Sequence, residues 1–258
     1  MGINVIPSSR YQTHDPCDDG IRTILSTGEI MTEMVMLAVG RIPSSKHINL
    51  EATGVKVDDR NYIEIDENTC TNVPHIFAVG DIGNRNVPSD LSLVHVAEAE
   101  GRCAAAKILD IEYPQGLDHI PYIVFTHPML AGAGVTEEYV RKKHGDVRVG
   151  KYPYARNHRA HAIQPPIGFV KLIVGPSGDD RILGVRAVGP HADTIVGAAA
   201  IMIERKLPYT YILESIFPHP SLLECLKGSA QIIAGDLLQY EEGEELTIAQ
   251  ALGEKSRE

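Results

Sequence analysis

The chain has 258 residues, which is long enough for one or two domains that each bury a hydrophobic core. A formal net charge of -10, with no long basic run, argues against nucleic acid as a partner. No apolar run approaches the roughly 20 residues needed to cross a bilayer, and the first ten residues contain no apolar signal region. We therefore expect a soluble, cytoplasmic protein that has no membrane partner.

The cysteines and aromatic residues narrow the class of fold. Four cysteines are far apart in the sequence and form no CxxC or CxxxxC pair, so we expect reduced, mostly structural thiols. The chain has no Trp and only four Phe, so its cores must be built from Ile, Val, Leu and Ala. This composition favours α/β architecture over an all-β sandwich.

Residues 1–45 are predicted to form short strands and turns. Residues 22–25 are a candidate strand, followed by a turn at 26–29 and an apolar run at 34–39 that ends in Gly40. Such a run is typical of a buried parallel strand inside a larger sheet. The region is, however, too short to complete that sheet by itself.

A second buried strand is predicted at 75–79, followed by a helix at 93–109. The strand ends in Gly80 and Asp81, where a doubly wound sheet places its ligand crevice. There the glycine permits close backbone approach, and the carboxylate can accept hydrogen bonds from ribose or ribityl hydroxyls. The free N–H groups of the following helix favour a pyrophosphate or an electron-rich ring edge. The plainer alternative is a strand, a capping Asp and a core helix.

From residue 120 the pattern changes to that of an α+β domain. We predict a helix at 137–143 that begins after Thr136 and stops at Gly145. The other predicted elements are a strand at 122–125, a hairpin of 168–174 and 181–188, and helices at 192–205 and 222–238. We expect the chain to divide into a first region at 1–118, an α+β domain at 119–240 and a loosely ordered acidic tail at 241–258.

The segment 217–224, FPHPSLLE, places His219 on a Pro-flanked turn just before a helix. An imidazole exchanges protons near neutrality, and a carboxylate such as that of Glu224 can fix its tautomer. In thiol chemistry such a base would convert a thiol to the thiolate that attacks a disulfide. The alternatives are a solvated His and a capping box, in which Ser221 and Glu224 exchange hydrogen bonds with each other's backbone N–H.

Residues 71–82, TNVPHIFAVGDI, resemble the second FAD-contacting motif of the pyridine nucleotide-disulfide oxidoreductases, which include dihydrolipoamide dehydrogenase, glutathione reductase and mercuric reductase. The resemblance implies that Asp81, after Gly80, binds the flavin ribityl chain. It also implies that the helix points its first residues, Val94 and His95, at the isoalloxazine.

Residues 38–43, AVGRIP, resemble the motif at which the family's nicotinamide-binding domain returns to the FAD domain. The resemblance adds Ala38, Gly40 and Arg41 to the cofactor-binding candidates. The cofactors it implies are FAD and either NAD or NADP. The fold it implies is α/β plus α+β, with a partial Rossmann-like FAD/NAD(P)-binding region followed by an α+β dimerisation domain.

Segment 217–224 resembles the family's His-Pro-Thr-x-x-Glu active-site motif, with Ser221 in place of Thr. It implies that His219 is the catalytic base and Glu224 its partner. The resemblance further implies a homodimer, in which this His reaches the flavin and redox-active disulfide of the other subunit. Residues 120–128 and 151–160 also resemble the family's dimerisation domain, with the dihydrolipoamide dehydrogenase and mercuric reductase branch the most similar.

Three parts of the family pattern are missing from this sequence: the GxGxxG fingerprint for FAD, that for NAD(P), and a closely spaced cysteine pair. By the resemblance they would lie before Met1, and they are missing by truncation, by gene splitting or because a partner chain supplies them. We expect the chain to need a partner, such as a separate N-terminal half chain, or else to have repaired its N-terminal part. The implied substrate is a small-molecule or protein disulfide or dithiol. The alternatives are a non-catalytic dimerisation or scaffold module and a cofactor-free binding protein.

Four further groups of residues carry less weight. His158 and His161, with Arg156 and Arg159, are interpreted as a polar loop at a dimer interface rather than as a metal or anion site. The other three interpretations are a loop for His14, Cys17 and Asp18, a core position for Cys225, and no nucleotide fingerprint for Gly132-Ala133-Gly134.

Overall fold

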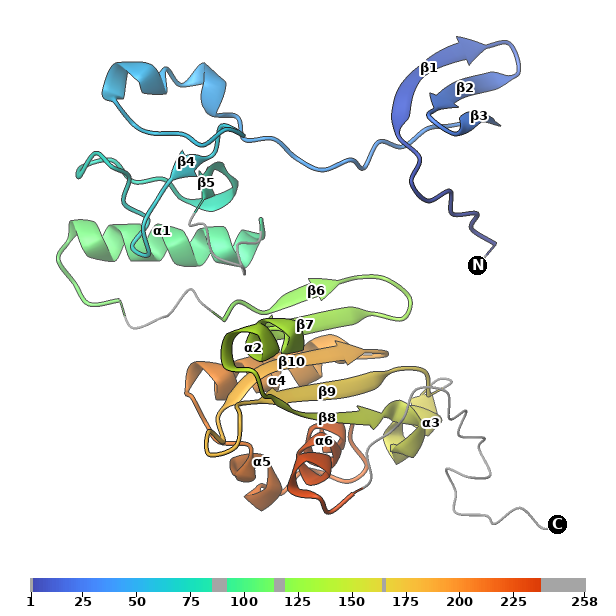
Figure 1. The fold of residues 1–258 in the computed structure, drawn as a ribbon, viewed down its shortest axis with the longest axis vertical. Coiled ribbons are helices and arrows are strands. Elements are labelled where there is room, and N and C mark those ends of the chain that lie inside the picture. Colours follow the sequence, from blue (N-terminus) through green and yellow to red (C-terminus); the bar gives the residue numbers. More distant parts are fainter. Residues whose placement is uncertain (1, 85–91, 114–118, 164–165, 238–258) are drawn as a thin grey trace. The chain divides into compact units, whose positions relative to one another are not determined.

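The computed structural model describes residues 2–84, 92–113, 119–163 and 166–237. The chain divides into two compact units, residues 1–42 and 43–258 (Figure 1). Within the described ranges, the helices are all too short or too polar to span a membrane. The predicted acidic tail at 241–258 lies outside the described residues.

Unit 1 is a three-stranded antiparallel meander of β1 (Tyr11–Cys17), β2 (Gly20–Leu25) and β3 (Gly28–Thr32). The predicted strand at 22–25 and its turn are confirmed. The prediction of a loop at His14 and Cys17 is wrong, because both residues lie in β1. Although β1 is exposed along its whole length, His14 pairs with Thr23 and Cys17 with Gly20, so backbone pairing, not burial, forms this strand.

The predicted buried strand at 34–39 is not found. These residues form no strand, and the side chains of Met34, Met36 and Val39 are exposed. A strand forms only where its N–H and C=O groups pair with a neighbour, and none of the described residues pairs with this run. The apolar composition of residues 34–39 is therefore not enough to make them a strand.

Unit 2 begins with a small subdomain whose core is formed by Val55, Ile63 and Ala78. Its elements are η1 (Ser45–His47), η2 (Leu50–Thr53), the parallel pair β4 (Ile63–Glu64) and β5 (Gly83–Asn84), and η3 (Gly80–Ile82). Helix α1 (Val94–Ile108) follows and agrees with the predicted helix to within one residue at each end. Its buried side includes Val96, Ala99 and Glu100.

The prediction of a strand at 75–79 is wrong, because the structure has no strand there. The segment forms a turn at 74–75, an isolated bridge between Cys70 and Phe77, and then η3. The N–H of Thr71 donates to the carbonyl of Ile76, so the segment folds back on the residues just before it. This local pairing takes the place of the predicted strand.

The second part of unit 2 is an antiparallel five-stranded sheet in the order β6-β7-β10-β9-β8 (Figure 1). Its strands are β6 (Tyr122–Val124), β7 (Leu130–Gly134), β8 (Arg148–Pro153), β9 (Phe169–Val174) and β10 (Ile182–Val188). Its helices are α2 (Glu137–His144), η4 (Tyr154–Arg156), α3 (His158–Ile163), α4 (Ala192–Glu204), α5 (Thr210–Glu214) and α6 (Glu224–Ala234). The predicted hairpin is confirmed as β9 and β10.

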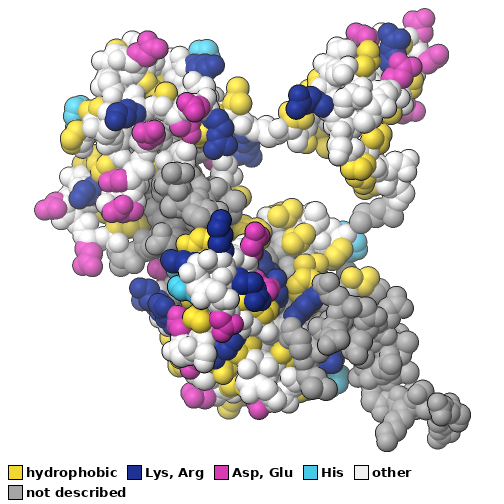
Figure 2. All heavy atoms as spheres, in the orientation of Figure 1, with side chains coloured by type: hydrophobic (Ala, Val, Ile, Leu, Met, Phe, Trp, Pro, Cys, Tyr) yellow, Lys and Arg dark blue, Asp and Glu magenta, His cyan; other side chains and the backbone are white. Residues whose placement is uncertain are grey.

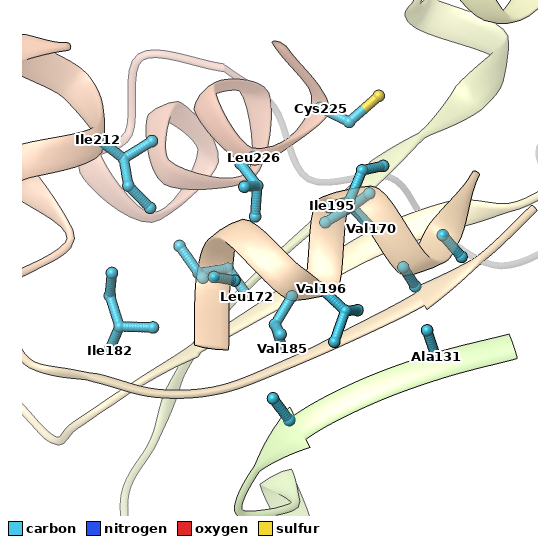
Figure 3. Close-up of a cluster of buried hydrophobic side chains, with 14 of the residues drawn as sticks. Ala131, Val170, Leu172, Ile182, Val185, Ile195, Val196, Ile212, Cys225 and Leu226 are labelled. Atoms are coloured by element: carbon cyan, nitrogen blue, oxygen red, sulfur yellow. The ribbon is translucent and has the colours of Figure 1, made fainter. Parts of the chain in front are cut away.

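The main hydrophobic core lies between this sheet and helices α4 and α6. Alternate residues of β9, among them Val170 and Leu172, point into it and are fully buried. From the helices, Ile195 and Leu226 close the core from the other side (Figure 3). Cys225 is also fully buried, so its predicted core position is confirmed.

Local capping signals set the helix ends in this domain. Thr136 accepts a hydrogen bond from the Tyr139 N–H at the start of α2, and Gly145 follows its last residue, as predicted. Helix α6 is shorter than the predicted 222–238, because it begins at Glu224 and ends where Gly235 adopts a left-handed conformation.

Candidate active site

The candidate catalytic pair lies at the start of α6. His219 Nδ1 is 2.9 Å from Glu224 Oε1, and the backbone N–H of Ser221 donates to Glu224 Oε2 at 2.8 Å. Both carboxylate oxygens are therefore occupied by the turn that carries His219. Because Glu224 is the first residue of α6, the rigid helix fixes the position of its side chain.

The protonation of Glu224 follows from these contacts. Partial burial raises the pKa of this carboxyl, but the Ser221 N–H bond, the His219 bond and the charges of His219 and His158 outweigh it, so the pKa is lowered. An ionised carboxylate can only accept, so His219 Nδ1 must donate the proton. Nε2 is then the ring nitrogen that can accept a proton.

Only half of the predicted capping box is present. Glu224 accepts from the Ser221 N–H, as predicted. The Ser221 hydroxyl, however, is buried without a hydrogen-bond partner among the described residues, and Leu223 occupies the N-cap position of α6. The Glu224 carboxylate is instead shared between the turn and His219, which is more than a helix cap requires.

Two residues at the start of α3 complete the surroundings of His219. The His158 ring lies edge-on to the His219 ring, with centroids 5.4 Å apart and an interplanar angle of 90°. Asn157 is buried, and its Nδ2 donates to the Ser221 carbonyl at 2.9 Å. The sequence reasoning missed Asn157 and placed His158 in a polar loop, whereas α3 begins at His158.

A cleft of about 380 Å³ opens beside Glu224. It lies between β8, α6 and the segment that leads to His219, and its lining residues are Tyr152, Ile216, Phe217, Glu224, Lys227, Gly228 and Gln231. The imidazole of His219 is 62% exposed. The pair is thus open to an approaching group from another molecule.

The candidate flavin-binding residues Gly80 and Asp81 lie in η3, next to α1. Gly80 has a φ of +74°, and its N–H donates to the buried Glu100 Oε2 of α1 at 2.6 Å. A Cβ at Gly80 would lie 3.2 Å from the Ala97 Cβ, so glycine permits this close approach. The side chain of Asp81 is exposed on this turn.

The first turn of α1 carries the other two candidates. Val94 is 77% exposed, and the N-cap residue Leu93 has no side chain that could accept from the first N–H groups. Such a helix start suits an anionic or electron-rich group, so the residues present fit a flavin. His95 Nε2 lies 2.7 Å from the carbonyl oxygen of Pro121.

The remaining cofactor candidates, Ala38, Gly40 and Arg41, lie in the exposed segment of unit 1 that follows β3. All four cysteines are free thiols. Over the described part of the chain, no three His, Cys, Asp or Glu residues gather into a group that could hold a metal ion.

Comparison with known proteins agrees with this arrangement. The family model "Pyridine nucleotide-disulphide oxidoreductase" matches residues 1–101, and the model for the dimerisation domain of the same family matches residues 120–230. The chain belongs to the pyridine nucleotide-disulphide oxidoreductase family. The expected mixed α/β fold is confirmed, with a region matched by the family's oxidoreductase model followed by one matched by its dimerisation-domain model.

Among curated relatives, the dihydrolipoyl dehydrogenase of Geobacillus stearothermophilus is 33% identical over 240 residues, covering 91% of this chain and 49% of that protein. The mitochondrial dihydrolipoyl dehydrogenase of Pisum sativum is 33% identical over 234 residues, covering 89% of this chain and 44% of that protein. The chain therefore spans about half the length of the curated relatives it matches.

Solved structures show the same fold. LpdA from Mycobacterium tuberculosis superimposes with a TM-score of 0.81 at 23% identity, covering 89% of this chain and 49% of that one. The HOCl-induced flavoprotein disulfide reductase RclA from Escherichia coli gives a TM-score of 0.74 at 23% identity, covering 86% of this chain and 50% of that one.

Proposed function

We propose that this chain is the C-terminal portion of a FAD-dependent oxidoreductase of the dihydrolipoamide dehydrogenase type. The enzyme would pass electrons between NAD(P)H and a disulfide or dithiol, and His219 and Glu224 would be its acid/base pair. The observation that carries this proposal is the 2.9 Å contact between His219 Nδ1 and a Glu224 carboxylate that the Ser221 N–H also binds.

The chemistry of the pair follows from its geometry. In dithiol oxidation, Nε2 of His219 accepts the proton of a substrate thiol, and the thiolate formed is the nucleophile that attacks a disulfide. Glu224 stabilises the resulting imidazolium across the Nδ1 contact. In the reverse direction, the imidazolium returns the proton to the leaving thiolate. FAD, when bound, would supply the electron transfer to or from the nicotinamide.

We assign the proposed flavin contacts to Gly80, Asp81 and the start of α1 at Val94 and His95. The exposed Asp81 carboxylate suits ribityl hydroxyls, and the start of α1, where Leu93 offers no side-chain cap, suits the electron-rich ring edge. Ala38, Gly40 and Arg41 are proposed as further cofactor contacts. The proposed domain boundaries remain 1–118, 119–240 and a tail at 241–258.

A homodimer is part of the proposal, because His219 and its neighbours lie open on the surface. Ile216 is 97% exposed and Phe125 is 81% exposed. Hydrophobic side chains also gather over the hairpin of β6 and β7 (Figure 2). Exposed apolar groups in the region matched by the dimerisation-domain model favour burial against a second subunit.

The glycine-rich fingerprints and the redox-active disulfide must be supplied from outside these residues, for which we propose an N-terminal half, either in the same polypeptide or as a separate chain. The cytoplasmic location stays a prediction from the sequence. The disulfide or dithiol substrate, small or protein-borne, is proposed by class only.

The test is to co-express the chain with the N-terminal half of a dihydrolipoyl dehydrogenase and to measure flavin absorbance and NAD(P)H-dependent disulfide reduction. We expect a yellow protein whose turnover falls by about 10²-fold or more in His219→Gln, the usual contribution of a general acid/base. His144→Gln, at the exposed end of α2, is the matched control and should retain activity. A colourless, inactive dimer would instead indicate a non-catalytic dimerisation module.

A further inference from the structure

The start of α3 is tied directly to the turn that carries His219. Asn157 is only 3% exposed, and its side chain bonds in two directions. Its Oδ1 accepts from the Ala160 N–H of α3, and its Nδ2 donates to the Ser221 carbonyl, both at 2.9 Å. Because a buried amide with both ends bonded holds its neighbours firmly, His158 is kept at a fixed place beside the turn.

From this position, the His158 ring contacts the His219 ring. The two rings meet edge to face, with centroids 5.4 Å apart and planes at 90°, which is a favoured geometry for aromatic pairs. His219 is 62% exposed, so its imidazole has room to rotate unless neighbours restrain it. Glu224 holds Nδ1 from α6, and His158 packs against the ring from α3.

In the described part of the chain, the titratable groups in contact with His219 are Glu224, from α6, and His158, from α3. The charge of His158, like that of His219, also acts on Glu224 and helps to keep its carboxyl ionised. His158 therefore contacts the ring of His219 and also acts through its charge on Glu224. Tyr152, whose hydroxyl donates to the Arg156 carbonyl at 2.9 Å, holds the residues just before Asn157.

We propose that His158 is a positioning residue of the His219–Glu224 pair: its ring holds the His219 imidazole so that Nδ1 stays on Glu224 and Nε2 faces the substrate side. This inference rests on the proposed function in assigning a catalytic use to Nε2. The ring contact itself is independent of any cofactor or substrate.

The experiment is NMR on the isotope-labelled full chain, comparing wild type with His158→Ala, His158→Phe and Arg159→Ala. The readouts are the Nδ1–H tautomer fraction of His219, from its ring nitrogen shifts, and the nuclear Overhauser contact between its ring and Glu224. Phe preserves an aromatic edge without a titratable group, whereas Ala removes the ring. Arg159 is the exposed neighbour on the same helix and serves as the matched control.

We expect wild type, His158→Phe and Arg159→Ala to keep His219 in the Nδ1–H form, and His158→Ala to populate both tautomers and lose the Glu224 contact. A His158→Ala spectrum that matches wild type for His219 would overturn the proposal. So would equal disturbance by Ala and Phe, because the aromatic contact would then not be the cause.

A second readout uses the protein complemented with an N-terminal half. There His158→Ala should lower kcat for the dithiol by about tenfold, with the KM for the nicotinamide nucleotide unchanged, and His158→Phe should restore most of it. An unchanged kcat in His158→Ala would contradict the proposal. If even the wild-type complex shows no turnover, the proposed function fails, while the NMR result still decides the role of His158.

Discussion

The Tyr152 ring of β8 packs directly against the backbone of Gly228 in α6. A Cβ at Gly228 would lie 2.2 Å from Tyr152 Cδ2, a distance that no real contact allows. This close approach brings α6 onto the sheet, and with it Glu224 at the start of the helix. The small residue at 228 therefore determines how near the proposed catalytic pair lies to β8.

Gly228→Ala should destabilise the protein although alanine is the better helix former. In a helix interior, Gly to Ala stabilises by about 1 kcal/mol. Overpacking against the Tyr152 ring costs about 1–3 kcal/mol, so the net effect should be a loss of up to about 2 kcal/mol. Gly197→Ala in α4 is the matched control, because a Cβ there meets nothing within 4 Å. Urea unfolding should show a lower midpoint for the first variant and an equal or higher one for the second.

Glu224→Gln should remove a pH-dependent part of the stability. The folded pKa of Glu224 is lowered, so its stabilising contribution is present above the unfolded carboxyl pKa of about 4.3 and is lost as pH falls through the folded value. The difference in unfolding free energy between wild type and Glu224→Gln should therefore be largest near neutrality and shrink in acid. Denaturant titrations at several pH values measure it; a difference that grows in acid would contradict the assignment.

Cys17, Cys103 and Cys225 should react with iodoacetamide in an order set by exposure and ionisation. Cys17 is exposed and should be alkylated first, whereas Cys103 is buried. Burial, with the charge of Glu224, raises the pKa of Cys225 to about 12, so its thiolate is scarce at pH 8. Mass spectrometry after short exposure should find Cys225 unmodified in the native chain and modified in denaturant. Early alkylation of Cys225 in the native chain would argue against the described core.

Ile216→Asp should weaken self-association without unfolding the domain. The side chain is 97% exposed next to the cleft beside Glu224, so the fold loses no packing when it is replaced. A charge in a buried apolar interface costs about 2 kcal/mol or more, so sedimentation should show that the dimer dissociates more readily, with an affinity at least about tenfold lower. Ile201→Asp, on the exposed side of α4, tests for a general effect of added charge. Equal loss in both variants would exclude a specific role for Ile216.

The sequence by itself determined the features that depend on neighbours in the chain. Thr136 and Gly145 mark the ends of α2, and the apolar runs either side of 175–180 form the β9 and β10 hairpin. These signals involve residues a few positions apart, so they can be recognised without knowing the rest of the fold. The spacing of His219 and Glu224 is local in the same sense, because both residues lie in the segment 217–224.

Only the tertiary structure decided the rest. The apolar runs at 34–39 and 75–79 have the composition of buried strands, yet neither becomes one, because a strand requires a paired neighbour that composition does not specify. Likewise, His158 meets His219 because Asn157 joins α3 to the turn before α6. That contact joins segments far apart in the chain, so it exists only once the sheet and α6 have packed together.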